Sequence, residues 1–150
     1  MMFGQFENGG DGWRPLMPVP RRTESLGITD RRLLWALRRL ALMQPIGAAR
    51  CHAVHIALQQ DFGDSGLGVE HLLRCLLVGL SRRADRQLVF GEPACPLLLP
   101  DEAALIAILH ADDLDGAAGL AALAGPRAAA LLPLVQGLHA MQKIYLGAPC

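Results

Sequence analysis

The chain has 150 residues, 52 % of them hydrophobic, and its 14 basic and 14 acidic side chains give a formal net charge of zero. A chain of this length and composition can bury a hydrophobic core of its own, so it needs no metal or disulfide to fold. Residues 1–90 hold twelve arginines against eight acids, and residues 91–150 hold two bases against six acids. This mild asymmetry is far from the strongly basic surface of nucleic-acid-binding domains, so we predict no nucleic-acid partner.

The start of the chain lacks the basic stretch and long apolar run of a secretory signal. The longest apolar region, residues 114–138, is too interrupted to cross a membrane, because it contains Asp115, Pro126, Arg127 and Pro133. We therefore predict a cytoplasmic protein with no membrane partner. In a reducing cytosol its four cysteines are expected to remain thiols.

Residues 1–29 are rich in glycine, proline and polar residues and show no periodic apolar face. This composition predicts a flexible N-terminal tail. Residues 30–150 then form a single helical domain.

The first predicted helix spans residues 31–44, where Thr29 or Asp30 can cap its start and Pro45 prevents its continuation. One face is apolar. The other carries a tryptophan among arginines: Arg31, Trp35, Arg38 and Arg39. Two interpretations stay open, because the guanidinium groups can stack on or cover the indole, or the face can meet a protein partner or a second copy.

Two further helices, residues 48–62 and 68–84, are predicted to form an antiparallel hairpin around the turn at residues 63–66. Apolar residues at 3.6-residue spacing give each helix a core face. On the second helix, Glu70, Arg74 and Ser81 are expected to face water.

A proline-rich loop follows, and Pro100-Asp101-Glu102 starts the next helix, residues 100–111. Proline and acidic residues both favour the first turn of a helix. Residues 114–124 and 127–146 are predicted as the last helices, with Pro133 kinking or dividing the second. The predicted fold class is all-α: a compact bundle of five or six helices with a proline-rich loop between helices three and four.

Cysteine and histidine occur in two mirrored pairs, Cys51-x3-His55 and His71-x3-Cys75. Residues at i and i+4 share a helix face, so a hairpin could gather thiols and imidazoles around zinc. A helical wheel at 100° per residue turns His71 toward solvent, which leaves Cys51, His55 and Cys75 with Cys95 as the fourth candidate ligand. Packed cysteines with histidines at the core boundary are the competing interpretation, and redox sensing by Cys95 is a third.

Familiar enzyme patterns are missing from the sequence, which has no glycine-rich phosphate loop, no G-x-S-x-G and no H-E-x-x-H. Asp101 and Glu102 are adjacent, and helix-start electrostatics explains them better than paired acid–base chemistry. A turn explains the next acidic cluster better than a cation site with Glu102 does: Asp112, Asp113 and Asp115. We predict no catalytic residues.

Residues 93–103, Pro-Ala-Cys-Pro-Leu-Leu-Leu-Pro-Asp-Glu-Ala, resemble the cysteine-bearing loop and Asp-Glu helix start of a family of short helical bacterial proteins. The resemblance extends over residues 30–111. The family favours extra cysteines before Cys95 and polar residues at 97–99, where this chain has leucines. Since the family has no established activity, the resemblance implies a helical fold on both sides of the loop and no function.

These patterns favour a non-catalytic protein-interaction or regulatory module without a cofactor, which binds a protein partner or its own copy through Arg31, Trp35, Arg38 and Arg39. One alternative is an enzyme whose active site has no recognisable motif. The other is a metal- or redox-responsive regulator, with zinc as the candidate metal, that uses Cys51, His55, Cys75 and Cys95.

Overall fold

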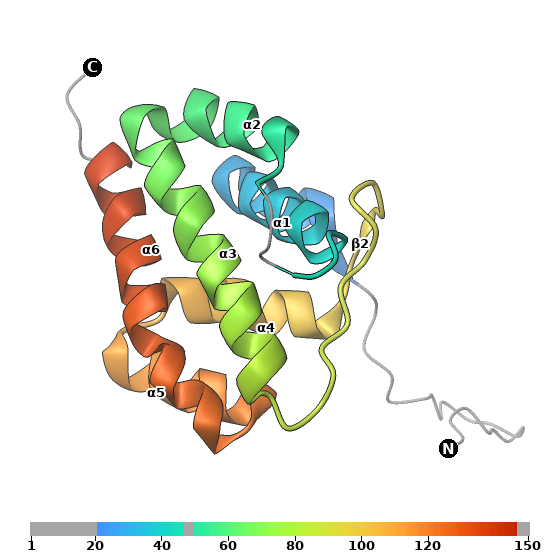
Figure 1. Cartoon of the computed structure of the whole chain (residues 1–150), viewed down its shortest axis with the longest axis vertical. Coiled ribbons are helices and arrows are strands. Elements are labelled where there is room, and N and C mark those ends of the chain that lie inside the picture. Colours follow the sequence, from blue (N-terminus) through green and yellow to red (C-terminus); the bar gives the residue numbers. More distant parts are fainter. Residues whose placement is uncertain (1–20, 47–49, 147–150) are drawn as a thin grey trace, which may run out of the picture.

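Helices α1 to α6 make up most of the computed structural model, which describes residues 21–46 and 50–146 (Figure 1). Their bounds are α1 Ile28–Ala41, α2 His52–Phe62, α3 Gly66–Arg83, α4 Pro100–His110, α5 Asp113–Ala124 and α6 Leu132–Leu146. Short 3-10 helices lie at Thr23–Ser25, Gly63–Ser65 and Pro126–Leu131. The predicted all-α fold is confirmed, as is the loop between the third and fourth α-helices. None of the helices in the described ranges is long and apolar enough to span a membrane.

Helix α3 is central to the bundle and packs against α1, α2 and α6 (Figure 1). Its apolar side chains recur every three or four residues, as the sequence predicted, and those that are buried are Val69, Leu73, Leu76, Leu77 and Leu80. Each buried leucine stabilises the fold by roughly 1.5–3 kcal/mol relative to an exposed one. The tight α2–α3 hairpin depends on Gly63, whose φ of +57° is rarely adopted by other residues.

Residues 21–29 differ from the predicted flexible tail. Arg21–Arg22 form strand β1, which pairs antiparallel with β2, Leu97–Leu98, in the proline-rich loop. The Thr23 amide adds a hydrogen bond of 2.9 Å to the Pro96 carbonyl. The remainder of the predicted tail, residues 1–20, lies outside the described residues. The difference arises from backbone pairing with a distant loop. Such pairing leaves no periodic apolar pattern in the sequence, so it could not be predicted.

Several helix boundaries also differ from the predictions. Helix α1 begins at Ile28 with Gly27 as its N-cap, so Thr29 and Asp30 lie within the first turn and do not cap it as predicted. Helix α2 begins at His52, so Cys51 is its N-cap residue rather than part of an apolar helical stripe. Residues 126–131 form a 3-10 helix, and Pro133 is the second residue of α6. Proline is tolerated there because amides in the first turn have no partner within the helix. Pro133 therefore divides the predicted last helix near its start and does not kink it.

Candidate functional site

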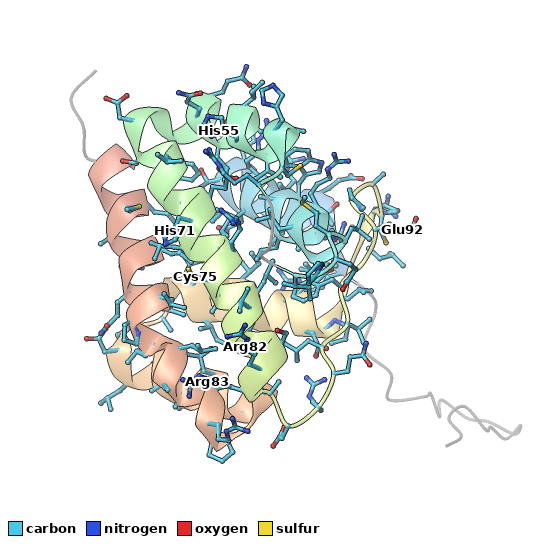
Figure 2. All side chains as sticks on the ribbon, viewed as in Figure 1. His55, His71, Cys75, Arg82, Arg83 and Glu92 are labelled. Atoms are coloured by element: carbon cyan, nitrogen blue, oxygen red, sulfur yellow. The ribbon has the colours of Figure 1, made fainter. Side chains whose placement is uncertain are left out.

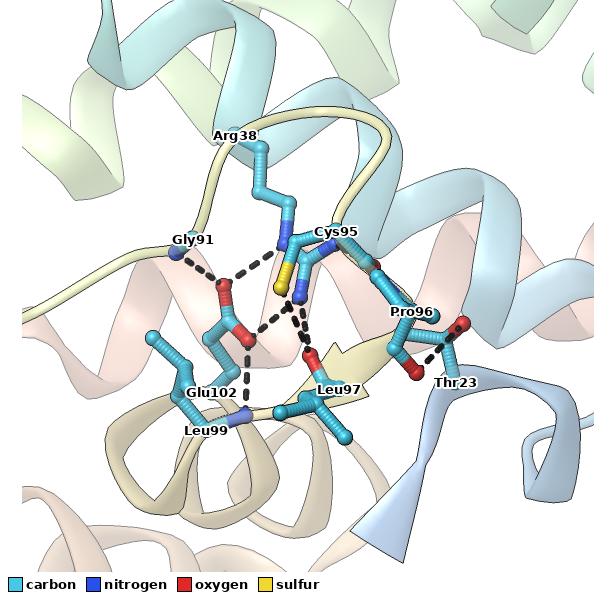
Figure 3. A network of polar contacts seen from close by, with 8 residues as sticks. All are labelled: Thr23, Arg38, Gly91, Cys95, Pro96, Leu97, Leu99 and Glu102. Atoms are coloured by element: carbon cyan, nitrogen blue, oxygen red, sulfur yellow. Dashed lines mark hydrogen bonds and ion pairs between the residues drawn. The ribbon is translucent and has the colours of Figure 1, made fainter.

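Arg38 does not belong to a partner-binding surface, which corrects the prediction from the sequence. Its side chain is only 2 % exposed, and it forms a buried ion pair with Glu102 of α4 (Figure 3). Arg38 Nε donates to Oε2 of Glu102 and Nη2 donates to Oε1, both at 2.7 Å. This two-pronged geometry suits the planar guanidinium group. The partners are 64 residues apart in the chain, so the helical wheel of α1 could not reveal the pair.

The same ion pair fixes the proline-rich loop against the bundle. Arg38 donates to the carbonyl oxygens of Cys95 and Leu97, at 2.8 and 2.7 Å. Glu102 accepts from the amides of Gly91 and Leu99, at 2.8 and 2.9 Å. Figure 3 shows the bonds from Arg38, Gly91 and Leu99 meeting at the Glu102 carboxylate. Buried polar groups are costly unless they are hydrogen-bonded, so each group in this cluster depends on the others. We interpret the cluster as structural.

The Glu102 carboxylate is held in its charged form. Burial alone would raise its pKa, but hydrogen bonds from Arg38, Gly91 and Leu99 outweigh this effect and lower the pKa below its ordinary value of 4.5. The neighbouring Asp101 also has a lowered pKa, because Arg86 donates hydrogen bonds to it at 2.6 and 3.2 Å. Both carboxylates therefore favour the folded state most when they are ionised.

Acid should destabilise the protein through Glu102. The lowered pKa adds stability that is fully present above the ordinary value of 4.5 and is lost as pH falls through the folded-state value. We expect the free energy of unfolding, measured by urea titration from neutral to acidic pH, to fall less steeply in Glu102→Gln. The exposed Glu24→Gln variant should keep the wild-type slope. Equal slopes for wild type and Glu102→Gln would contradict the assignment.

Trp35 is half-buried and packs against the hydrophobic core. The guanidinium carbons of Arg32 and Arg39 lie 5.7 and 5.9 Å from its ring centroid. These distances match the interpretation in which guanidinium groups stack on the indole of Trp35. Arg39 was among the predicted stacking residues, whereas Arg32 takes the role that was predicted for Arg31 or Arg38. Arg31 is exposed and makes no ion pair with any described residue. The predicted surface on α1 therefore has its aromatic side chain engaged by its own helix.

The structure does not gather the candidate zinc ligands. His55 lies on α2, whereas Cys75 lies on α3 with its sulfur 3.6 Å from Nε2 of His71 (Figure 2). The Cys95 sulfur instead contacts the Leu97 carbonyl at 3.7 Å. Across residues 21–46 and 50–146, no three cysteine, histidine or acidic side chains form a group that could hold a metal. His71 is exposed, as predicted.

Cys51 contacts an arginine instead of a histidine. Arg39 Nη2 lies 3.8 Å from its sulfur. Burial would raise the pKa of the Cys51 thiol, but hydrogen bonds from the Val54 backbone and from Arg39 outweigh it, and the pKa is lowered.

Glu70 is buried, which corrects the prediction that it faces water. Its exposed fraction is 1 %. Arg50 donates to its Oε1 at 3.1 Å, and Nδ1 of His55 lies 3.3 Å from the same oxygen. The imidazole of His55 is therefore engaged by a carboxylate and an arginine. As with Arg38, partners from a neighbouring element allow a charged side chain to be buried.

A groove beside α3 is the feature that sequence analysis missed. It encloses about 600 Å³ and is lined by His71, Arg74, Cys75, Val78, Gly79, Arg82, Arg83, Arg127 and Leu131. Figure 2 shows the labelled members of α3, from His71 to Arg83, following one another along the helix. The lining residues of α3 recur every three or four positions, which places them on one side of the helix. Arg127 and Leu131 come from the 3-10 helix Pro126–Leu131.

The groove is cationic because its lining contains four arginines and no carboxylate. Arg82, Arg83 and Arg127 are exposed, and none of them forms an ion pair or hydrogen bond with the described part of the chain. Five arginines outside the groove pair with carboxylates: Arg22 with Glu24, Arg32 with Asp61, Arg38 with Glu102, Arg50 with Glu70, and Arg86 with Asp101. The groove thus brings together three arginines that have no carboxylate partner among the described residues.

Comparison of the chain with protein-family models, with curated proteins and with solved structures found no match. The resemblance of residues 93–103 to a bacterial family therefore stays a prediction. The groove can be interpreted from its own chemistry. Guanidinium groups donate several hydrogen bonds and do not release a proton in proteins, so Arg82, Arg83 and Arg127 are suited to binding anions and not to acid–base catalysis.

One signal for the groove was present in the sequence. Arg82 and Arg83 end α3, and His71 and Cys75 precede them on the same side. The sequence alone does not mark Arg82 and Arg83 as a binding site, because bases are common in the last turn of a helix, where they interact favourably with the dipole. Arg127 completes the cluster from another element, and only the folded chain shows this.

Proposed function

We propose that this protein is a non-catalytic interaction module that binds an acidic segment of a partner protein in the cationic groove of α3. The observation that carries the proposal is the cluster of Arg82, Arg83 and Arg127, three guanidinium groups without an anion among the described residues. The proposal keeps the function class favoured by the sequence and moves the surface from α1 to α3. The burial of Arg38 supports this move, because it removes the centre of the α1 surface.

An acidic protein segment fits the lining better than a nucleic acid does. The groove lining contains no phenylalanine, tyrosine or tryptophan on which a base could stack. Val78, Gly79 and Leu131 instead provide an apolar strip beside the arginines, which suits aliphatic side chains of a peptide. The zero net charge of the chain also argues against a general affinity for polyanions.

A peptide-binding measurement tests the proposal. The probe is a short fluorescein-labelled peptide of alternating glutamate and leucine, followed by fluorescence anisotropy at low ionic strength. We expect Arg82→Gln/Arg127→Gln to weaken binding by about tenfold or more, because hydrogen bonds to charged groups contribute roughly 1.5–3 kcal/mol each. Added salt should weaken wild-type binding as well.

The matched control is Arg21→Gln/Arg31→Gln, which removes the same charge from two exposed arginines outside the groove. It should bind the peptide within about twofold of wild type, a difference well below 1.4 kcal/mol. Because Arg31 belongs to the predicted α1 surface, this variant also tests whether the peptide binds on α1 or in the groove of α3. Equal losses in both variants, or tighter binding of a single-stranded RNA than of the peptide, would overturn the proposal.

A further inference from the structure

The cationic groove offers more positive charge than one carboxylate can neutralise. We infer that its ligand is a phosphate monoester on a side chain of the partner segment, an inference that rests on the proposed function. A carboxylate carries one negative charge and two oxygens. A phosphorylated side chain carries a charge of about −1.5 to −2 and three acceptor oxygens at neutral pH. One such group can accept hydrogen bonds from Arg82, Arg83 and Arg127 together.

Leu131, the last residue of the 3-10 helix Pro126–Leu131, packs closely against Gly79 of α3. A Cβ atom at position 79 would collide with the Leu131 side chain, which would have to shift. Because Arg127 belongs to that 3-10 helix, this close approach places its guanidinium group in the same groove as Arg82 and Arg83. The cluster thus draws its charges from two separate elements.

The backbone beside Arg127 is also anchored. The Asp85 amide, just beyond the end of α3, donates to the Ala124 carbonyl at 2.9 Å. Gly125 then turns the chain with a φ of +97°, a conformation that side chains disfavour. These features connect the end of α3 to the start of the 3-10 helix, so the three arginines share one framework. The backbone that carries the arginines is therefore already in place, and only their side chains need to be ordered on binding.

The apolar strip favours a phosphate carried by a peptide over free inorganic phosphate. Val78 and Leu131 line the groove beside the arginines and can contact the chain that carries the phosphate, whereas inorganic phosphate has nothing to place there. Arginine clusters are a recurrent means of binding phosphorylated peptides. A phosphorylated protein segment therefore uses both parts of the lining.

Three labelled peptides of one sequence test the inference, with serine, glutamate or phosphoserine at the central position. The remaining positions alternate between glutamate and leucine. We expect the phosphoserine peptide to bind about tenfold more tightly than the glutamate peptide. Arg83→Gln and Arg127→Gln should each reduce this preference severalfold, whereas Arg31→Gln should retain it. The preference should also decline below about pH 6, where the phosphate dianion takes up a proton and becomes a monoanion.

The outcomes separate the two proposals. If the glutamate and phosphoserine peptides bind equally and both depend on Arg82 and Arg127, the phosphate inference is overturned and the proposed function stands. If none of the peptides binds, both are overturned. Inorganic phosphate that binds as tightly as the phosphopeptide would also overturn the inference. So would binding to vesicles containing a phosphoinositide without binding to the phosphopeptide, since the ligand would then be a membrane headgroup.

Discussion

Arg38→Met is expected to lower the free energy of unfolding by about 3–5 kcal/mol, because it leaves the Glu102 carboxylate buried and charged without its partner. Glu102 is 1 % exposed, so water cannot replace the two lost hydrogen bonds. The carbonyl oxygens of Cys95 and Leu97 lose their donor in the same variant. Urea unfolding at neutral pH, followed by circular dichroism, measures the change.

Two further variants make this prediction specific. Asp61→Asn weakens the half-exposed Arg32–Asp61 pair, whose atoms lie 2.6 Å apart, and should cost only about 0–1 kcal/mol. Arg38→Met/Glu102→Leu removes both buried charges and should cost less than the sum of the two single variants. An Arg38→Met variant no less stable than Asp61→Asn would contradict a structural role for the buried pair.

Gly66→Ala is expected to destabilise the protein by about 1–3 kcal/mol or more, the cost typical of overpacking. An added Cβ would lie 2.7 Å from the Leu58 carbonyl oxygen and 2.8 Å from the Cα and N atoms of Gln59. These are backbone atoms of α2, so no side-chain rotation can relieve the clash. Helix α3 would have to move away from α2, which loosens the core between them. A lower midpoint of thermal unfolding would record this loss.

Gly27→Ala is the control for this substitution. Position 27 is the N-cap of α1, its backbone is extended, and an added Cβ would meet no atom within 4 Å. We expect a change within about 0.5 kcal/mol, as for most surface substitutions. If Gly66→Ala melted at the same temperature as Gly27→Ala, the close approach of α2 and α3 would not limit the side chain at position 66.

Much of the fold follows from patterns within short stretches of sequence. The apolar spacing of residues 69–80 predicted the core face of α3, and Pro100-Asp101-Glu102 marked the start of α4. Both are local effects, because a helix places residues three or four apart on one side and orients its own dipole. The α2–α3 hairpin was likewise predictable from its glycine-containing turn.

The candidate site was less predictable. A helical wheel assigns charged residues to the solvent side, and this rule was wrong for Arg38 and Glu70 because each finds a partner on another element. The converse case concerns residues that the sequence groups together but the fold keeps apart: Cys51, His55, Cys75 and Cys95. Their spacing allowed a shared metal site as one of three interpretations, but their side chains have separate sets of neighbours in the folded chain.

Local periodicity was thus sufficient for the helices, the proline-rich loop and the all-α class, since these depend on contacts between residues near in the chain. The burial of Arg38, the pairing of Arg21–Arg22 with Leu97–Leu98 and the meeting of Arg127 with Arg82 and Arg83 depend on distant segments packing together. Hydrogen bonds and charge pairs act over a few ångströms, so a polar residue's role depends on which backbone segments approach it. Gly79 illustrates the point, because its missing side chain has no effect on the helical pattern of α3 and yet leaves space for Leu131 of the 3-10 helix.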